Sequence, residues 1–144
     1  MCHSTPVVPF RVDLQLGLPL HEQVVFAAKK AMVSGQLRPG DPFPSLRAMS
    51  KALKIHANTA AKVVSQLIAD GLLEVKPGVG TIVAAGRAST RAERSRLLTH
   101  DVEQLTVEAL HLGLTLDDLQ SAIAAQWRSL QGQQSKVRTA NDSR

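Results

Sequence analysis

The chain has 144 residues, 44% of them hydrophobic, which is enough for one domain or for a small domain with an appendage. Seventeen Lys and Arg against twelve Asp and Glu give a net charge of +5, which favours a polyanionic partner. The single cysteine, Cys2, excludes an internal disulfide. No apolar run is long enough for a signal peptide or a membrane span, so we expect a cytoplasmic protein that does not bind membranes.

The N-terminal part of the sequence predicts an arm, one helix and a tight connection. Residues 1–9 lack a periodic pattern and are expected to form a flexible N-terminal arm. Beyond Pro19, apolar residues recur three and four positions apart as far as Met32, which predicts a helix, and Gly35 is placed to end it. Pro and Gly are frequent in residues 37–44, so this segment is expected to turn tightly.

Two short amphipathic helices are predicted next, joined by a turn at 54–57. Ser45 directly precedes the first helical pattern, as an N-cap residue does. The residues expected to be buried are Leu46, Met49 and Leu53 in the first helix and Ala60, Val63, Val64, Leu67 and Ile68 in the second. The opposite face of the second helix is small, polar and basic, which suits contact with nucleic acid.

A β-hairpin is predicted after the second helix. Residues 72–76 and 81–83 are rich in β-branched and apolar residues, and the tip at 77–80 holds two glycines. Helix, turn, helix and glycine-tipped hairpin form the plan of a winged helix-turn-helix domain, here over residues 10–85, which places its second helix in the major groove of DNA. The fold class expected for the chain is therefore mainly α with a small β-wing.

Short motifs in this region resemble those of the GntR family of bacterial transcriptional regulators. The matching pieces are Gly35–Asp41, Pro44–Arg47, Asn58–Lys62, Asp70–Leu73 and Gly78–Val83. Family members with an effector-binding domain carry a much longer C-terminal part, so the chain looks most like the YtrA-type subfamily. That resemblance implies a homodimeric repressor of an inverted-repeat operator in double-stranded DNA, without a cofactor, controlling a transport or envelope-stress operon. It leaves a small-molecule effector unidentified.

The C-terminal residues predict two helices with apolar faces over 86–131, followed by a disordered tail at 132–144. Gly113 is placed to end the first of these helices, and Thr115 with Asp118 forms a capping pattern for the second. The residues predicted to mediate dimerisation are Leu98, Val102, Leu105, Ala109, Leu112, Leu119, Ile123 and Trp127. The alternative is that the first apolar stripe packs only against the final helix of the same chain.

Candidate DNA contacts follow from the motifs and from the outward positions of the predicted helices. The arginine of the family's motif is Arg47, whose guanidinium is suited to a guanine edge or a phosphate. Where many members have a basic residue at the start of the second helix, this chain has Ala57, preceded by His56. The full set of DNA-binding candidates is Ser45, Arg47, His56, Asn58, Thr59, Lys62, Lys76, Gly78 and Gly80.

Other classes of function have weaker support in the sequence. No nucleophile elbow, phosphate-binding loop or dinucleotide motif occurs, so an enzyme is not expected. No group of residues has metal-ligand spacing, and Cys2 with His3 is taken as a chance pairing. A winged helix that acts as an architectural, replication, RNA-binding or adaptor module is the alternative to a regulator. The basic run at 87–96 is either a solvated helix or an outer phosphate contact.

Overall fold

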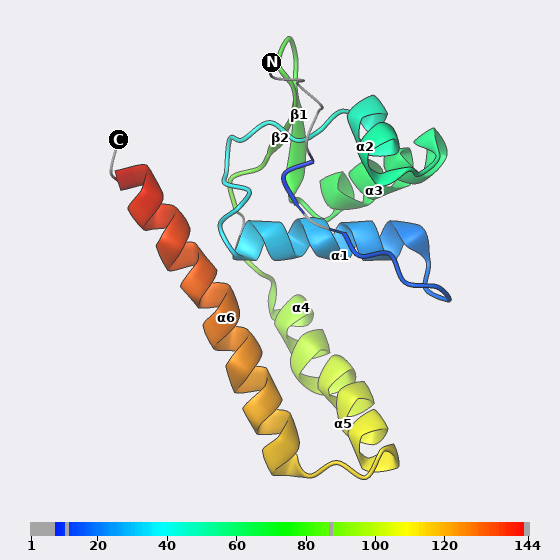
Figure 1. Ribbon diagram of the computed structural model, residues 1–144, viewed down its shortest axis with the longest axis vertical. Coiled ribbons are helices and arrows are strands. Elements are labelled where there is room, and N and C mark those ends of the chain that lie inside the picture. The colour runs from blue at the N-terminus through cyan, green and yellow to red at the C-terminus, as the bar shows by residue number, and fades with distance from the viewer. Residues whose placement is uncertain (1–7, 11, 87, 143–144) are drawn as a thin grey trace. The chain divides into compact units, whose positions relative to one another are not determined.

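The computed structural model describes residues 8–10, 12–86 and 88–142 (Figure 1). Contacts divide the chain into two compact units: Met1–Gly86 together with Gln133–Arg144, and Arg87–Gly132. The described residues contain mostly helix and one antiparallel two-stranded sheet. The prediction of a mainly α fold with a small β-wing is therefore confirmed.

The first unit contains three helices and a hairpin. Helix α1 spans Leu20–Val33, α2 Leu46–Leu53 and α3 Ala57–Ala69, and strands β1 (Leu73–Lys76) and β2 (Gly80–Val83) follow. The hydrophobic stripes of the three helices meet in one core, whose residues with no more than 1% exposure are Val24, Ala28, Ala31, Met49, Ala60, Val63 and Leu67. Burial of each large side chain in this core contributes about 1.5–3 kcal/mol relative to exposure.

The end of α1 and the connection after it follow the predicted turn chemistry. Ser34 caps the helix, and Gly35 has a φ of 84°, which an L-residue with a side chain rarely adopts. The amides of Gln36 and Leu37 then donate to the carbonyl of Ala31. Further along, Pro42 forms a β-bridge with Ile82, so the connection runs alongside the hairpin before it enters α2.

The N-terminal segment is better ordered at its end than the pattern predicts. Residues 1–7 of the predicted flexible arm lie outside the described residues, but Val8 is buried in the core. Phe10 is also buried, and its ring stacks on Phe43 with the centroids 5.9 Å apart. The prediction of an arm without structure through residue 9 is therefore wrong at Val8, because this apolar side chain fills space in the core of the helical domain.

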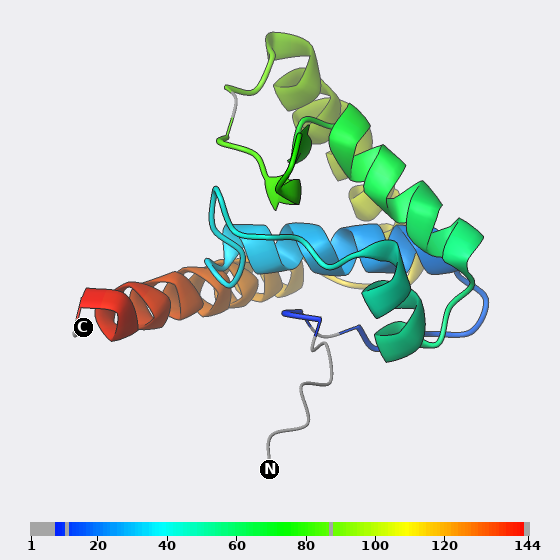
Figure 2. The same cartoon turned by 90° about the horizontal axis from the view of Figure 1, so that it is seen from above.

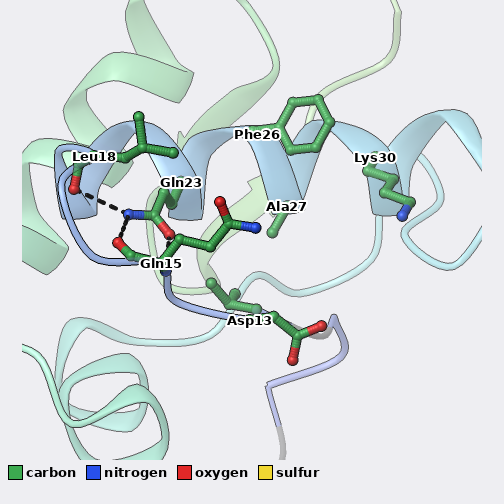
Figure 3. Close-up of a pocket in the computed structure, with 8 residues that line it drawn as sticks. Asp13, Gln15, Leu18, Gln23, Phe26, Ala27 and Lys30 are labelled. Carbon is green, nitrogen blue, oxygen red and sulfur yellow. Dashed lines mark hydrogen bonds between the residues drawn. The ribbon is translucent and has the colours of Figure 1, made fainter.

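Gln23 on α1 fixes the loop that precedes the helix (Figure 3). Its side-chain oxygen accepts from the backbone N–H of Gln15 at 2.7 Å, and its amide nitrogen donates to the carbonyls of Gln15 and Leu18, both at 3.0 Å. An open pocket of about 370 Å³ lies between this loop and α1, with Phe26 and Lys30 among its lining residues. The loop is thus held by local bonds rather than by a strand.

Two residues predicted to be buried are partly exposed. Leu46 is 40% exposed and Ile68 is 39% exposed, whereas Met49 and Val63 are fully buried. Leu46 begins α2 and Ile68 lies in the last turn of α3, so both occupy helix ends where the core no longer covers the whole apolar face. The central turns of both helices match the predicted stripes.

The second unit is a helical hairpin. Helix α4 spans Arg91–Arg96 and continues through a π-helical turn, η1 (Leu97–Asp101), into α5 (Val102–His111). After the turn at Gly113, whose φ is 75°, helix α6 runs from Leu116 to Asp142, and its residues beyond Gly132 are grouped with the first unit. No helix within the described ranges has the length and apolar character that a membrane crossing requires.

Helix α6 contradicts the predicted disordered tail. The region from residue 132 was expected to be disordered, yet α6 continues to Asp142, and only residues 143–144 of that tail lie outside the described part. The tail is polar, which suggested disorder. It extends a helix that has already formed upstream, so it does not repeat the cost of helix nucleation. The N-terminal capping bonds of α6, between Thr115 and Asp118, agree with the prediction.

Candidate DNA-binding surface

The start of α2 holds Ser45 and Arg47. The Ser45 hydroxyl accepts a hydrogen bond of 3.1 Å from the backbone N–H of Ala48, and this confirms the predicted N-cap. Met49 is fully buried on the core side of the same helix, and Arg47 is exposed. The buried side therefore fixes the rotation of α2, and the Arg47 side chain is presented to solvent or to a ligand.

The turn between α2 and α3 is short and firmly anchored. Lys54 caps α2 in the left-handed conformation, with φ 55° and ψ 47°, and its N–H donates to the carbonyl of Ser50. The N–H of Ile55 donates to the same carbonyl at 3.2 Å, and the Ile55 side chain is buried. This apolar anchor fixes the point at which α3 begins.

Helix α3 presents a polar outer face. Asn58 and Lys62 are exposed and Thr59 is half-buried. His56 occupies the N-cap position with an extended backbone, but its side chain makes no capping hydrogen bond. Ala60, Val63 and Leu67 lie fully buried on the other side. The amphipathic division predicted for this helix is therefore present, with Thr59 at its boundary.

The hairpin forms the wing, with Lys76 paired opposite Gly80 at its end. Gly78 and Gly80 have φ values of 78° and 109°, and the N–H of Val79 donates to the carbonyl of Lys76 at 3.1 Å. These glycines are therefore required by the shape of the tip. A Cβ atom built on either glycine would meet no atom within 4 Å, so the limit on substitution is the backbone conformation rather than space.

Two exposed apolar side chains of the wing were missed by the sequence reasoning. Val75 is 63% exposed on β1, and Val79 is 72% exposed between the two glycines of the tip. Alternation along β1 would place Val75 on the same side as Leu73, but of this strand only Leu73 is buried. The position of Val79 between Gly78 and Gly80 at the hairpin tip was the one available indication of its exposure.

The DNA-binding candidates all belong to one unit, on three neighbouring elements. Helix α2 holds Arg47, its cap is Ser45, α3 holds Asn58, Thr59 and Lys62, and the wing holds Lys76 with the glycines. The connection before α2 is bonded to β2, since the N–H of Gly40 donates to the carbonyl of Val83 at 2.8 Å. Basic and polar groups on a helix-turn-helix with an attached wing can contact phosphates and base edges of a duplex.

Metal chemistry has no site in the part of the chain that the structure describes. Nowhere in that part do three His, Cys, Asp or Glu side chains gather closely enough to hold an ion. Cys2 and His3 lie outside the described residues, as does Arg87 at the start of the basic run. The remaining arginines of that run, Arg91, Arg94 and Arg96, are exposed on α4.

The predicted dimerisation residues lie on the helical hairpin, and most of them are exposed. Ala109 is buried and Leu119 is half-buried. The others expose large apolar side chains: Leu98 71%, Val102 44%, Leu105 45%, Leu112 64%, Ile123 50% and Trp127 64%. Packing against the final helix of the same chain therefore covers only a small part of the predicted stripes.

This arrangement of helices and hairpin is that of a winged helix-turn-helix DNA-binding domain. Residues 20–83 match the family of bacterial regulatory proteins described as the gntR family. The matched segment begins with α1 and ends with the last residue of β2, so it contains α1, α2, α3 and the wing, and this part of the chain is similar to that family.

Relatives and solved structures extend the likeness beyond that domain. The HTH-type transcriptional repressor YtrA of Bacillus subtilis (strain 168) is 26% identical over 110 residues, covering 76% of this chain and 85% of the relative. The HTH-type transcriptional regulator YhcF of the same strain is 27% identical over 111 residues, covering 77% of this chain and 92% of the relative. A structure described as a transcriptional antiterminator from Listeria monocytogenes EGD-e has a TM-score of 0.75 at 20% identity, covering 84% of this chain and 91% of that one. The last likeness concerns the fold alone.

Proposed function

We propose that the protein is a dimeric repressor that binds an inverted-repeat operator in double-stranded DNA. The observation that carries this proposal is the exposed apolar surface of the helical hairpin, where Leu105 and Trp127 are 45% and 64% exposed. Monomeric proteins rarely leave a large contiguous apolar surface in water. The same surface of a second copy is a self-complementary cover for it, as in most homodimers.

A dimer also suits the size of the DNA-binding unit. A single recognition helix contacts only a few base pairs, whereas two linked helices make the second contact in effect intramolecular. Two-fold symmetry in the protein then favours an inverted repeat in the DNA, with half-sites spaced by the dimer. The described residues contain one winged helix, and a second copy would supply the other one for two half-sites.

The contact roles follow from exposure and side-chain chemistry. Arg47 is assigned to a guanine edge or a phosphate and Lys62 to the groove, both from exposed helix positions. Asn58, Thr59 and Ser45 are assigned to phosphate contacts, which set register. Lys76, Gly78 and Gly80 are assigned to the contact of the wing with the backbone or minor groove. His56, the N-cap of α3, is assigned to a contact at the end of the helix that we propose enters the groove.

Repression follows most simply from occlusion of a promoter by the bound dimer. The B. subtilis relative named as a repressor supports this direction of control. Control of a transport or envelope-stress operon remains a prediction, as does the cytoplasmic location that access to bacterial DNA requires. The operator sequence, once known, identifies the target genes.

Selection of bound sequences from a random pool of duplex DNA, at near-physiological salt, tests the proposal. We expect a palindromic motif, and we expect single half-sites to bind much more weakly than the full repeat. The Arg47→Ala variant is the matched control and should recover no motif. Recovery of no motif by the wild-type protein would favour an architectural or adaptor function instead.

A further inference from the structure

Lys54 has a backbone conformation that sets it apart from every other non-glycine residue in the described ranges. Its φ is 55°, and the other described residues with positive φ are all glycines. The residue caps α2 and stands in the turn between α2 and α3. A lysine therefore occupies the position in the helix-turn-helix at which glycine is the usual residue.

This conformation is unfavourable for a residue that carries a Cβ atom. In the left-handed region the Cβ approaches the following carbonyl oxygen, and glycine avoids that contact. A residue held in such a conformation is a reason to look for a functional role of its side chain. The question for Lys54 is therefore what its side chain contributes that glycine does not.

The folded protein itself does not use the Lys54 side chain. The residue is exposed, and the two hydrogen bonds that fix the turn come from the backbone N–H groups of Lys54 and Ile55 to the carbonyl of Ser50. An ion pair of 3.5 Å joins Lys29 of α1 to Asp70, the C-cap residue of α3, and does not involve Lys54. Among the described residues, the Lys54 ammonium has no carboxylate partner.

We propose that Lys54 contacts a DNA phosphate beside the groove that α3 enters. The proposal rests on the DNA-binding function proposed above. Lys54 stands two residues before His56, the N-cap of α3, at the end of the helix that approaches the duplex. A flexible side chain with a point charge is suited to a phosphate and not to the two-point contact that distinguishes a base.

Three substitutions at this position separate charge from backbone conformation. Lys54→Gly removes the charge and relieves the conformation, Lys54→Gln removes the charge alone, and Lys54→Arg keeps the charge. We expect Lys54→Gly to melt a few degrees higher than the wild-type protein, and Lys54→Gln and Lys54→Arg to melt close to it. The variants rank differently in DNA binding: we expect Lys54→Gly and Lys54→Gln to bind more weakly than the wild-type protein, and Lys54→Arg to retain binding.

The measurement is the salt dependence of binding to duplex DNA, together with thermal melting. For Gly and Gln, the slope of log affinity against log salt should fall in magnitude by about 0.9 for each subunit that contacts the duplex. Lys30→Gln, on the exposed side of α1, removes the same charge elsewhere and should leave the slope unchanged. A slope that is equal in the wild-type protein and in Lys54→Gln would overturn the proposal.

The test also separates this inference from the proposed function. If the wild-type protein binds all sequences equally, the operator proposal fails, but the slope on random duplex still reports the contact of Lys54. If the wild-type protein selects an operator and Lys54→Gln binds it with unchanged affinity and slope, Lys54 makes no contact and the operator proposal stands. Weaker binding by Lys54→Gly alone, with Lys54→Gln unaffected, would assign the effect to turn flexibility and would also overturn the proposal.

Discussion

The backbone N–H of Phe43 donates a 2.9 Å hydrogen bond to the carbonyl of Thr81, which joins the segment before α2 to the returning strand of the wing. Phe43 is two residues before the N-cap Ser45, and its ring also stacks on Phe10. Together with the bonds from Gly40 to Val83 and from Val83 to Asp41, this contact ties the segment that leads into α2 to strand β2 of the wing. Groups on both elements can approach a duplex together without either element having to move first.

Substitution of Arg47 by alanine is expected to abolish specific binding and to leave folding unchanged. The side chain is exposed and lies opposite the buried Met49, so its loss removes no core contact. A guanine contact contributes about 1–3 kcal/mol for each half-site. Competition binding with the selected operator and thermal melting measure the two effects. Arg128→Ala on α6 removes an equal charge and is the control; operator affinity unchanged by Arg47→Ala would contradict the base contact.

Substitutions at Ser45 distinguish its capping bond from a phosphate contact. Ser45→Ala removes the acceptor for the Ala48 N–H and should lower the free energy of unfolding by about 1 kcal/mol. Ser45→Asp keeps a capping acceptor, so stability should be retained, but its negative charge should weaken DNA binding. Urea unfolding and operator titration measure both quantities. If Ser45→Asp binds DNA as well as the wild-type protein, Ser45 is a cap only.

Leu105→Asp is expected to convert the proposed dimer into a monomer. Leu105 is 45% exposed on α5, so a charge there is tolerated in the single chain but would be buried without a partner in the proposed interface. Sedimentation velocity over a range of concentrations measures the change, and Gln104→Asp, at the neighbouring exposed position, is the control. A dimer that persists in Leu105→Asp would place the interface elsewhere.

Acid is expected to weaken the start of α6 through Asp118. The backbone N–H of Thr115 donates to the Asp118 carboxylate at 2.8 Å, and this bond, followed by one with the Thr115 hydroxyl, holds the pKa of the exposed carboxyl below its ordinary value of 3.8. Because the folded pKa is lowered, the stabilisation is complete above the ordinary value and is lost as the pH falls through the folded value. Circular dichroism from neutral pH to about pH 1, below both pKa values, should show a smaller loss for Asp118→Ala, which lacks the group. An equal loss in both proteins would contradict this role.

Local features of the fold were predictable from the sequence. The end of α1 at Gly35, the cap at Ser45 and the hairpin tip at Gly78 all depend on the preferences of a few adjacent residues. The outward face of α3 followed from helical periodicity, which the buried Val63 confirms. The DNA contacts assigned to that face remain predictions.

Features that depend on contacts distant in sequence were not predictable in the same way. Val8 is buried because the helical core leaves room for it, and nothing in residues 1–9 indicates that space. The exposure of Leu46 and Ile68 depends on where neighbouring elements end. The extension of α6 to Asp142 and the π-helical turn at Leu97–Asp101 are likewise absent from the periodic pattern, which continues without interruption from Leu98 to Val102.

The π-helical turn makes this part of the chain tolerant of a change in length. A π turn holds one residue more than an α turn, so a deletion within Leu97–Asp101 can be absorbed by a return to regular helix, with α4 and α5 keeping their faces. The same deletion inside α5 would turn every later residue of that helix by about 100° and carry the apolar stripe away from its partner. Deletion of Thr99 should therefore leave the oligomeric state unchanged, whereas deletion of Thr106 should disrupt it. Among natural variants of this chain, single-residue gaps in the hairpin are expected to cluster at the π turn.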